Sequence, residues 1–273
     1  MNMNKHNQPI AIITGASAGI GRASAVALNK AGYKVFGTSR KPSTDNPHGV
    51  TMLVADVTSD ASIKKLVDDV MAETGRIDLL INNAGFGVTG AAEESSIAQV
   101  RALFETNFFG TVRVTNAVLP IMRQPRSGRV LNLSSGLGFI PAPYNAHYSA
   151  TKHAIEGYSE ALDHEVREFG IRVVLIEPGA TQSSFEGSTA QADTPLTAYG
   201  ASRAKYNLAW KRQMTTADTS ESVAQTVLRA ARDPQPRLRY PSGKQATQGA
   251  FARRFLPRAF FDKTLHKQFG LGQ

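Results

Sequence analysis

Three residues in one stretch of the chain have the types and spacing needed for proton transfer. Tyr148 and Lys152 stand four positions apart in a segment whose pattern continues as a helix, so their side chains share one face. A free phenol has a pKa of about 10, and a neighbouring ammonium favours the phenolate and lowers that pKa. Ser135, thirteen residues before Tyr148, offers a hydroxyl for the same substrate oxygen. We interpret the stretch as an acid–base site; a Lys stem packed over a Tyr ring is the alternative.

A glycine-rich turn after the first apolar strand can bind phosphate. Residues 9–14 are typical of a short buried strand, residues 14–21 read TGASAGIG, and a helical pattern follows. Glycines let the backbone approach a pyrophosphate, and the N-terminus of the helix offers free N–H donors. The candidate cofactor contacts in this turn are Gly15, Ser17, Gly19, Ile20 and Gly21.

The same turn also matches G-x-S-x-G, the nucleophile elbow of α/β-hydrolases. That elbow normally follows several strands, whereas this turn follows the first one. The elbow's histidine partner comes on a loop after a later acid, but His147, His153 and His164 all fall in one helical region. The hydrolase interpretation is therefore the weaker alternative.

The residues after the second strand favour NADP(H), with NAD(H) as the alternative cofactor. An NAD-binding unit of this kind carries an Asp or Glu about 20 residues past the glycines, which holds the ribose 2′-hydroxyl. Residues 22–44 contain no acid, and Ser39, Arg40 and Lys41 stand at that place. A guanidinium there can bind a 2′-phosphate. A solvated basic turn is the other explanation.

Apolar strand-like runs alternate with helical runs along most of the chain. This order predicts an α/β fold, a Rossmann-type doubly wound parallel sheet of about seven strands with helices on both faces. Ligands bind outside the carboxyl ends of such strands. Besides 9–14, strands are expected at 34–38, 50–56, 76–85, 128–135, 171–179 and 237–243, and helices at 62–75, 96–122 and 220–232.

Composition excludes several classes of site. The 273 residues are 41% hydrophobic and contain no cysteine, so disulfides, thiol catalysis and zinc–thiolate sites are excluded; we expect no metal. The polar N-terminus lacks a signal-peptide pattern and no apolar run reaches membrane-spanning length, so we expect a cytoplasmic protein. The net charge is +9, and ten Lys or Arg against two Asp from Arg229 onward account for +8 of it. A basic tail on a neutral body indicates a local role rather than nucleic-acid binding.

We expect one domain over residues 1–273, with two additions to the alternating core. Residues 180–218 are polar and loop-rich, as is common in a substrate lid. Residues 244–273 form a basic, Phe-rich C-terminal extension that alternates Phe and Leu with Arg and Lys. This extension fits a helix packed on the core, a subunit contact, a lid over an apolar pocket, or a membrane-surface helix, the last of which we do not expect.

Six ordered motifs make the chain resemble the short-chain dehydrogenase/reductase family over roughly residues 8–240. The motifs are TGASAGIG at 14–21, NNAG at 82–85, Asn107 in NFFG, Ser135, YSATK at 148–152 and PG at 178–179. The resemblance implies an NADP(H)-dependent oxidoreductase that interconverts a secondary alcohol and a carbonyl. Arg40, in place of an acid, resembles the family's NADP-preferring members.

The resemblance also implies a role for each matching position. Tyr148 would be the general acid or base, Lys152 would lower its pKa and hold the nicotinamide ribose, and Ser135 would steady the substrate oxygen. Asn107 would hold a water in the proton relay. Further cofactor contacts would come from Asp56, Val57, Asn83, Ala84, Gly85, Pro178, Gly179 and Thr181. The pocket candidates Leu137, Phe139, Tyr144 and Phe185, together with Ser135, indicate a small apolar alcohol or carbonyl substrate.

Within the family, the chain looks most like the branch of hydroxysteroid and retinol dehydrogenases and their bacterial relatives. The insertion at 180–218 and the extended C-terminus carry this comparison. The resemblance implies a homo-oligomer, either a dimer or a tetramer. A non-catalytic NADP-binding regulator on the same fold is the alternative function, and the intact Ser135, Tyr148 and Lys152 argue against it.

Overall fold

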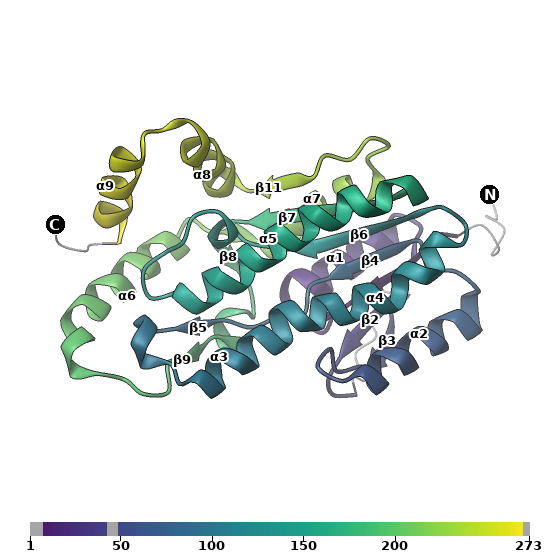
Figure 1. Ribbon diagram of the computed structural model, residues 1–273, viewed down its shortest axis with the longest axis horizontal. Coiled ribbons are helices and arrows are strands. Elements are labelled where there is room, and N and C mark those ends of the chain that lie inside the picture. Colours follow the sequence, from purple (N-terminus) through teal and green to yellow (C-terminus); the bar gives the residue numbers. More distant parts are fainter. Residues whose placement is uncertain (1–7, 43–48, 270–273) are drawn as a thin grey trace.

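The computed structural model describes residues 8–42 and 49–269 and has a parallel sheet at its centre (Figure 1). The sheet has seven strands in the order β11-β7-β6-β4-β1-β2-β3, all paired in parallel. This confirms the predicted doubly wound sheet, including the seventh strand. The strands are β1 (Ile10–Ile13), β2 (Lys34–Ser39), β3 (Thr51–Val54), β4 (Leu79–Asn82), β6 (Gly128–Leu133), β7 (Ile171–Pro178) and β11 (Arg239–Ser242).

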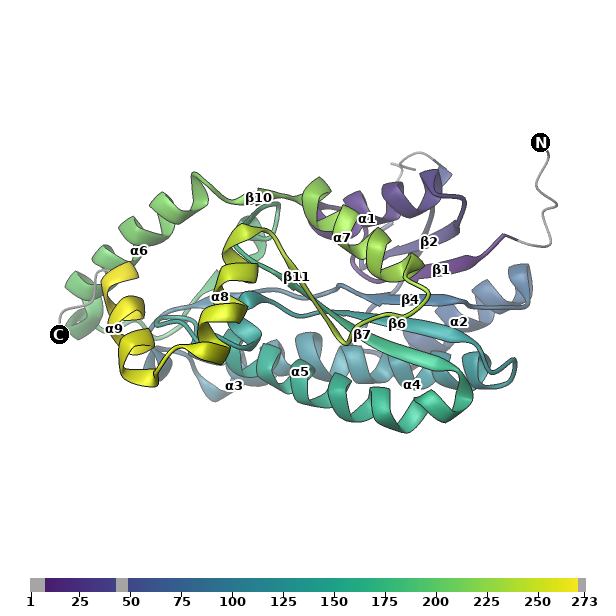
Figure 2. The same cartoon turned by 90° about the horizontal axis from the view of Figure 1, so that it is seen from above.

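Helices cover both faces of the sheet (Figure 2). One face carries α1 (Gly19–Lys30) and α7 (Ser220–Arg232), and the other carries α2 (Asp60–Thr74), α4 (Gly110–Arg123) and α5 (Ala146–Val166). Each face therefore has an apolar core of its own. Because the central strands are buried on both sides, they are continuous apolar runs rather than alternating ones.

The helix boundaries follow from local capping. The Ser59 hydroxyl accepts a hydrogen bond from the Ser62 N–H at the start of α2, and that helix ends at Gly75, whose φ is 69°. Thr219 caps α7 in the same way, through the Ser222 N–H. These bonds satisfy backbone donors that the first helical turn leaves unpaired. They explain why the predicted helices at 62–75 and 220–232 lie close to the observed ones.

The predicted helix at 96–122 is interrupted by one π-helical turn. It consists of α3 (Ile97–Phe104), the π-helical η4 (Glu105–Phe109) and α4. A π-turn inserts an extra residue into the helix and reorients the side chains around it. Here Asn107 lies within that turn and is buried, with 2% of its surface exposed.

Two additions lie beyond the carboxyl ends of the strands. Residues 180–218 contain α6 (Gly200–Met214), and the C-terminal extension forms α8 (Lys244–Phe255) and α9 (Arg258–Gln268); its residues 270–273 lie outside the described part of the chain. The three helices, here called the roof, gather at one end of the molecule (Figures 1 and 2).

The short strands are β5 (Val88–Thr89), β8 (Thr181–Gln182), β9 (Ala190–Gln191) and β10 (Asp218–Thr219), and the 3-10 turns are η3 (Ala92–Glu94), η5 (Gly136–Gly138), η6 (Arg167–Phe169), η7 (Glu186–Ser188) and η8 (Thr197–Tyr199).

Among the described residues, no helix combines the length and the apolar character needed to cross a bilayer.

Candidate active site

A cavity of about 1200 Å³ opens at the carboxyl ends of the strands. Its polar end is formed by the glycine turn and the loops after β2, β3 and β4, and its apolar end lies beneath the roof. Tyr148, Lys152 and Ser135 lie where the two ends meet, so a reacting group held there contacts both.

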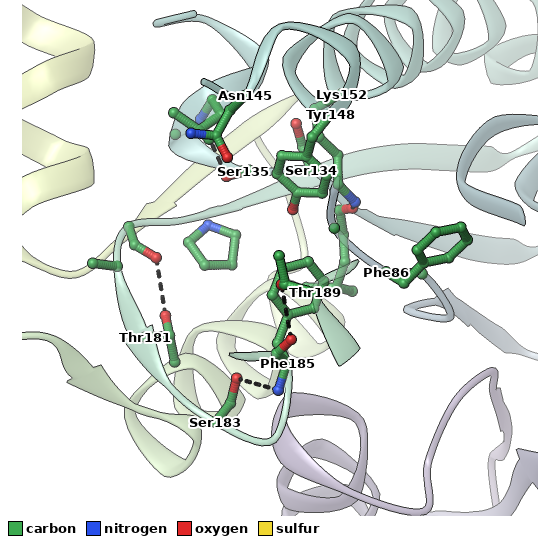
Figure 3. Close-up of a pocket in the computed structure, with 18 of the residues that line it drawn as sticks. Phe86, Ser134, Ser135, Asn145, Tyr148, Lys152, Thr181, Ser183, Phe185 and Thr189 are labelled. Atoms are coloured by element: carbon green, nitrogen blue, oxygen red, sulfur yellow. Dashed lines mark hydrogen bonds between the residues drawn. The ribbon is translucent and has the colours of Figure 1, made fainter. Parts of the chain in front are cut away.

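The acid–base residues converge as their spacing predicts. Tyr148 and Lys152 project from the first turns of α5, and the Tyr148 ring points into the cavity (Figure 3). Lys152 Nζ lies 5.6 Å from the centre of that ring and donates a 2.7 Å hydrogen bond to the Leu133 carbonyl at the end of β6. Ser135 follows β6, its Oγ accepts a 3.1 Å hydrogen bond from the Leu137 N–H, and its hydroxyl lies close enough to Tyr148 to lower the pKa of the phenol.

Burial decides the protonation of this pair. It raises the pKa of Tyr148, and the neighbouring Ser135 hydroxyl opposes that shift. It lowers the pKa of Lys152 to about 8, while the Glu156 carboxylate opposes that shift. We expected the Lys152 ammonium to lower the pKa of Tyr148, but desolvation of the phenol, which is 91% enclosed, dominates, and Lys152 is not among the groups that shift this pKa. A protonated phenol is the form that donates a proton to a carbonyl oxygen.

Two buried carboxyl groups lie behind the lysine. Glu156 stands one turn after Lys152 on the same face of α5, and Glu177 lies near the end of β7. Arg239 Nε lies 2.9 Å from Glu156 Oε2 and 3.5 Å from Glu177 Oε1. Burial, with the Glu156 charge beside it, raises the pKa of Glu177 to about 8. This pair was not among the residues predicted from the sequence, although the four-residue spacing from Lys152 to Glu156 places both side chains on one helix face.

Asn107 does not border the cavity, but its side chain holds together two segments that lie beside it. Its Oδ1 accepts a 3.0 Å hydrogen bond from the Phe86 N–H, and its Nδ2 donates to the Phe86 carbonyl at 3.0 Å and to Thr151 Oγ1 at 3.2 Å. These bonds join the loop after β4 to α5. The role of Asn107 in a proton relay stays a prediction.

The glycine turn has the backbone geometry that phosphate binding requires. Gly15 and Gly19 have φ values of 67° and 54°, which disfavour other residues. No side chain caps the N-terminus of α1, where Ala18 borders the cavity, so the first N–H groups of the helix are available to an anion. The turn therefore fits the pyrophosphate of a dinucleotide.

Gly21 does not border the cavity, so its predicted contact with the cofactor stays a prediction. A Cβ at Gly21 would lie 2.2 Å from the Gly15 carbonyl oxygen, so this glycine permits close packing of α1 under the turn. The other four predicted residues of the turn, Gly15, Ser17, Gly19 and Ile20, do border it.

The loops after β2 and β3 line the far part of the polar end. Ser39, the exposed Arg40, Asp56 and Val57 all border the cavity. The Asp56 carboxylate accepts hydrogen bonds of 2.9 and 2.8 Å from the Thr58 N–H and hydroxyl, which lower its pKa, and the Arg40 charge adds to this effect.

The remaining predicted cofactor contacts, Asn83, Ala84, Gly85, Pro178, Gly179 and Thr181, also border the cavity. The Asn83 amide donates 3.0 and 2.9 Å hydrogen bonds to the Thr14 and Gly15 carbonyls. Asn83 therefore holds the glycine turn in place.

The predicted substrate residues divide into two groups. Leu137, Phe139 and Phe185 border the cavity, and the Phe185 ring centre lies 5.6 Å from that of Tyr148 (Figure 3). Tyr144 does not border the cavity but packs against α6, so its predicted role at the substrate stays a prediction. Its φ of 59° departs from the usual backbone conformation, its hydroxyl donates a 2.6 Å hydrogen bond to Ser202 on α6, and its ring packs on Tyr206.

The roof supplies lining residues that the sequence analysis did not name individually. Phe261 and Leu265 on α9 and Phe269 directly after it border the apolar end of the cavity, as do Ala252 on α8 and Leu256 directly after that helix. The four-residue spacing on α9 is visible in the sequence, but it does not reveal what the helix covers. Among the roles considered for the C-terminal extension, a lid over an apolar pocket agrees with the position of these side chains at the cavity.

Comparisons with known proteins agree with this geometry. A family model described as short chain dehydrogenase matches residues 9–194. The chain is 34% identical to the uncharacterized oxidoreductase YbbO of Escherichia coli over 264 residues, 94% of each chain. It is 48% identical over 176 residues to a 3-ketodihydrosphingosine reductase of Bacteroides thetaiotaomicron, a match that spans 64% of this chain and 65% of that one.

A solved structure extends the likeness to the whole fold. The crystal structure of a short-chain dehydrogenase from Streptomyces avermitilis has a TM-score of 0.83 and 33% sequence identity, and the match covers 96% of this chain and 97% of that one. A short-chain dehydrogenase from Burkholderia cenocepacia, solved in complex with NADP, has a TM-score of 0.76 at 23% identity over 95% of this chain and 98% of that one. The chain belongs to the short-chain dehydrogenase/reductase family and is an NAD(P)-dependent oxidoreductase.

Proposed function

We propose that this enzyme uses NADP(H) to interconvert a ketone and a secondary alcohol on an elongated apolar substrate. The observation that carries the proposal is the position of Tyr148, Lys152 and Ser135 between a phosphate-binding turn and an apolar chamber. The relative named 3-ketodihydrosphingosine reductase also supports a ketone substrate. The hydroxysteroid- and retinol-dehydrogenase-like branch, the cytoplasmic location and the homo-oligomer stay predictions.

The catalytic residues act on the carbonyl oxygen. Ser135 donates a hydrogen bond to it and Tyr148 transfers its phenolic proton to it. A nicotinamide cofactor held at the polar end of the cavity would supply the hydride for the carbonyl carbon. The Lys152 ammonium then stabilises the Tyr148 phenolate. In the direction of alcohol oxidation, the phenolate takes the proton back.

Cofactor preference rests on the loop after β2. Arg40 lies exposed at the polar end of the cavity, within electrostatic reach of Asp56. A guanidinium there pairs with a 2′-phosphate, whereas no acid from residues 22 to 44 is present to hold a 2′-hydroxyl. This arrangement supports NADP(H) over NAD(H).

The test combines a fluorescence titration with a substrate series. We expect NADPH to bind at least about tenfold more tightly than NADH. We also expect turnover of methyl ketones to rise with alkyl chain length, because each buried CH₂ contributes about 0.8 kcal/mol. Tight NADPH binding without turnover of any carbonyl or alcohol would favour the non-catalytic regulator, and binding of neither cofactor would overturn the proposal.

A further inference from the structure

Large apolar side chains on the roof face solvent. Phe251, Phe255 and Phe260 are 65, 62 and 59% exposed, and Leu256 between them is 40% exposed. The Phe251 and Phe255 rings lie 4.7 Å apart along one side of α8. We call these four residues the tail patch. A soluble surface rarely gathers apolar side chains in this way, and such a patch marks an interaction site.

The tail patch sits among positive charges. Residues 244–269 contain six Lys or Arg and one Asp, so they carry +5 of the chain's net +9. The Arg254 guanidinium lies 5.6 Å from the Phe255 ring centre, next to the patch, and Lys263 and Lys267 are exposed on α9. A surface that combines exposed aromatic rings with basic side chains complements an apolar layer bounded by anionic groups.

The tail patch is also continuous with the apolar end of the cavity. Leu256 is exposed and at the same time borders the cavity. Phe260 is followed directly by Phe261, which is buried and borders the cavity. One short stretch of chain therefore connects the outer surface with the chamber that would hold an apolar substrate.

We propose that the tail patch docks on the surface of an anionic lipid bilayer, with its apolar side chains inserted and the basic side chains on the headgroups. A second copy of this chain is a less favourable partner for the tail patch. A symmetric contact would bring together two C-terminal segments that each carry a net charge of +5, and these would repel each other. Docking in this orientation places the apolar end of the cavity against the membrane. An apolar substrate then passes from lipid to the cavity with less exposure to water.

The test is flotation of the full-length protein with phosphatidylcholine vesicles that contain or lack phosphatidylglycerol. We expect binding to the anionic vesicles, weakened about tenfold for each substitution in F251S, F255S and F260S, since burying a Phe is worth about 1.5–3 kcal/mol. The double variant K263Q/K267Q should lose about fivefold in affinity for each charge, because a basic residue near an anionic surface contributes about 1 kcal/mol.

Matched control variants distinguish binding through the tail patch from nonspecific adsorption of the protein to vesicles. F109S removes a Phe that is 49% exposed beside α4, and K64Q/K65Q removes two exposed charges on α2. Both controls should bind vesicles as the wild type does. Far-UV circular dichroism and NADPH titration of the Phe variants check that the fold is intact.

Three results would overturn the proposal. The first is that the wild type does not bind the anionic vesicles. The second is that the control variants lose as much vesicle affinity as the tail-patch variants. The third is that the protein forms dimers without vesicles and the Phe substitutions dissociate them. The flotation readout does not depend on turnover, so its failure is distinguishable from failure of the proposed enzymatic function.

Discussion

The two ends of the cavity are held by different kinds of contact. At the polar end, backbone geometry and short polar bonds dominate: Thr14 Oγ1 accepts 3.0 Å hydrogen bonds from the Asn83 and Ala84 N–H groups, and Asn83 in turn holds Gly15. At the roof, aromatic packing dominates, with the Tyr206 ring stacked 5.5 Å from Phe269 and 6.4 Å from Trp210.

Under the proposed function, this difference would separate cofactor binding from substrate selection. The polar end is built on the carboxyl edge of the sheet, so a substitution there would disturb a bond to the proposed cofactor or to the turn. The roof helices contact the rest of the chain through side chains, so a substitution there changes the shape of the chamber. Substitutions at the two ends should therefore affect different kinetic parameters.

The largest effect is expected at the junction of the two ends. Tyr148→Phe removes the transferable proton and leaves the ring in place, so kcat should fall by about 10²–10⁴-fold. NADPH affinity should stay within about twofold of the wild type. Steady-state kinetics with a ketone, together with a fluorescence titration, measure both quantities. Retained turnover would show that another group supplies the proton.

The next effect tests the polar end alone. Arg40→Ala should weaken NADPH binding by about 10- to 100-fold, because a charge-assisted bond contributes about 1.5–3 kcal/mol. NADH affinity and kcat at saturating cofactor should be unchanged. Lys41→Ala is the neighbouring control for loss of one exposed charge. An equal loss of NADPH and NADH affinity would contradict the role of Arg40 at the 2′-phosphate.

A smaller effect tests the roof alone. Leu265→Ala removes three carbons from the apolar end of the cavity, and the KM for a long-chain ketone should rise by about tenfold. The KM for a short ketone and the affinity for NADPH should not change. Leu208→Ala, at a 53% exposed position on α6 that does not border the cavity, is the control. An equal rise for short and long ketones would mean that the roof does not hold the alkyl chain.

The smallest effect concerns the carboxyl pair behind Lys152. In the unfolded chain Glu177 has an ordinary pKa of about 4.3, whereas burial raises it to about 8 in the fold. The folded state thus holds the extra proton, so its stability is greatest below the unfolded pKa and falls as the pH rises through the folded one.

Glu177→Gln should flatten this dependence, because the neutral amide has no proton to lose. We expect the variant to gain about 5 °C in Tm relative to the wild type at pH values above the folded pKa. Glu73→Gln, at an exposed position on α2, is the control. Thermal melts across the pH range measure the effect, and parallel curves for all three proteins would exclude Glu177 as the titrating group.

The polar end could be predicted from the sequence because its geometry is local. The turn needs glycines at Gly15 and Gly19 wherever the rest of the chain lies, and the four-residue spacing of Tyr148 and Lys152 holds on any helix. Alternation of strand and helix then brings these stretches to one edge of the sheet. The parallel, doubly wound sheet matches the expected fold, and most of the residues predicted for the polar end border the cavity.

What only the tertiary structure decided is which distant side chains meet. A single π-turn aims Asn107 at Phe86, the backbone at Tyr144 turns its ring toward α6, and Arg239 reaches the two buried carboxyl groups from the last strand. The sequence determined the chemistry of the polar end, because backbone conformation and helical spacing are short-range properties. The roof and the carboxyl pair depend on contacts between elements far apart in the chain, which no local pattern specifies.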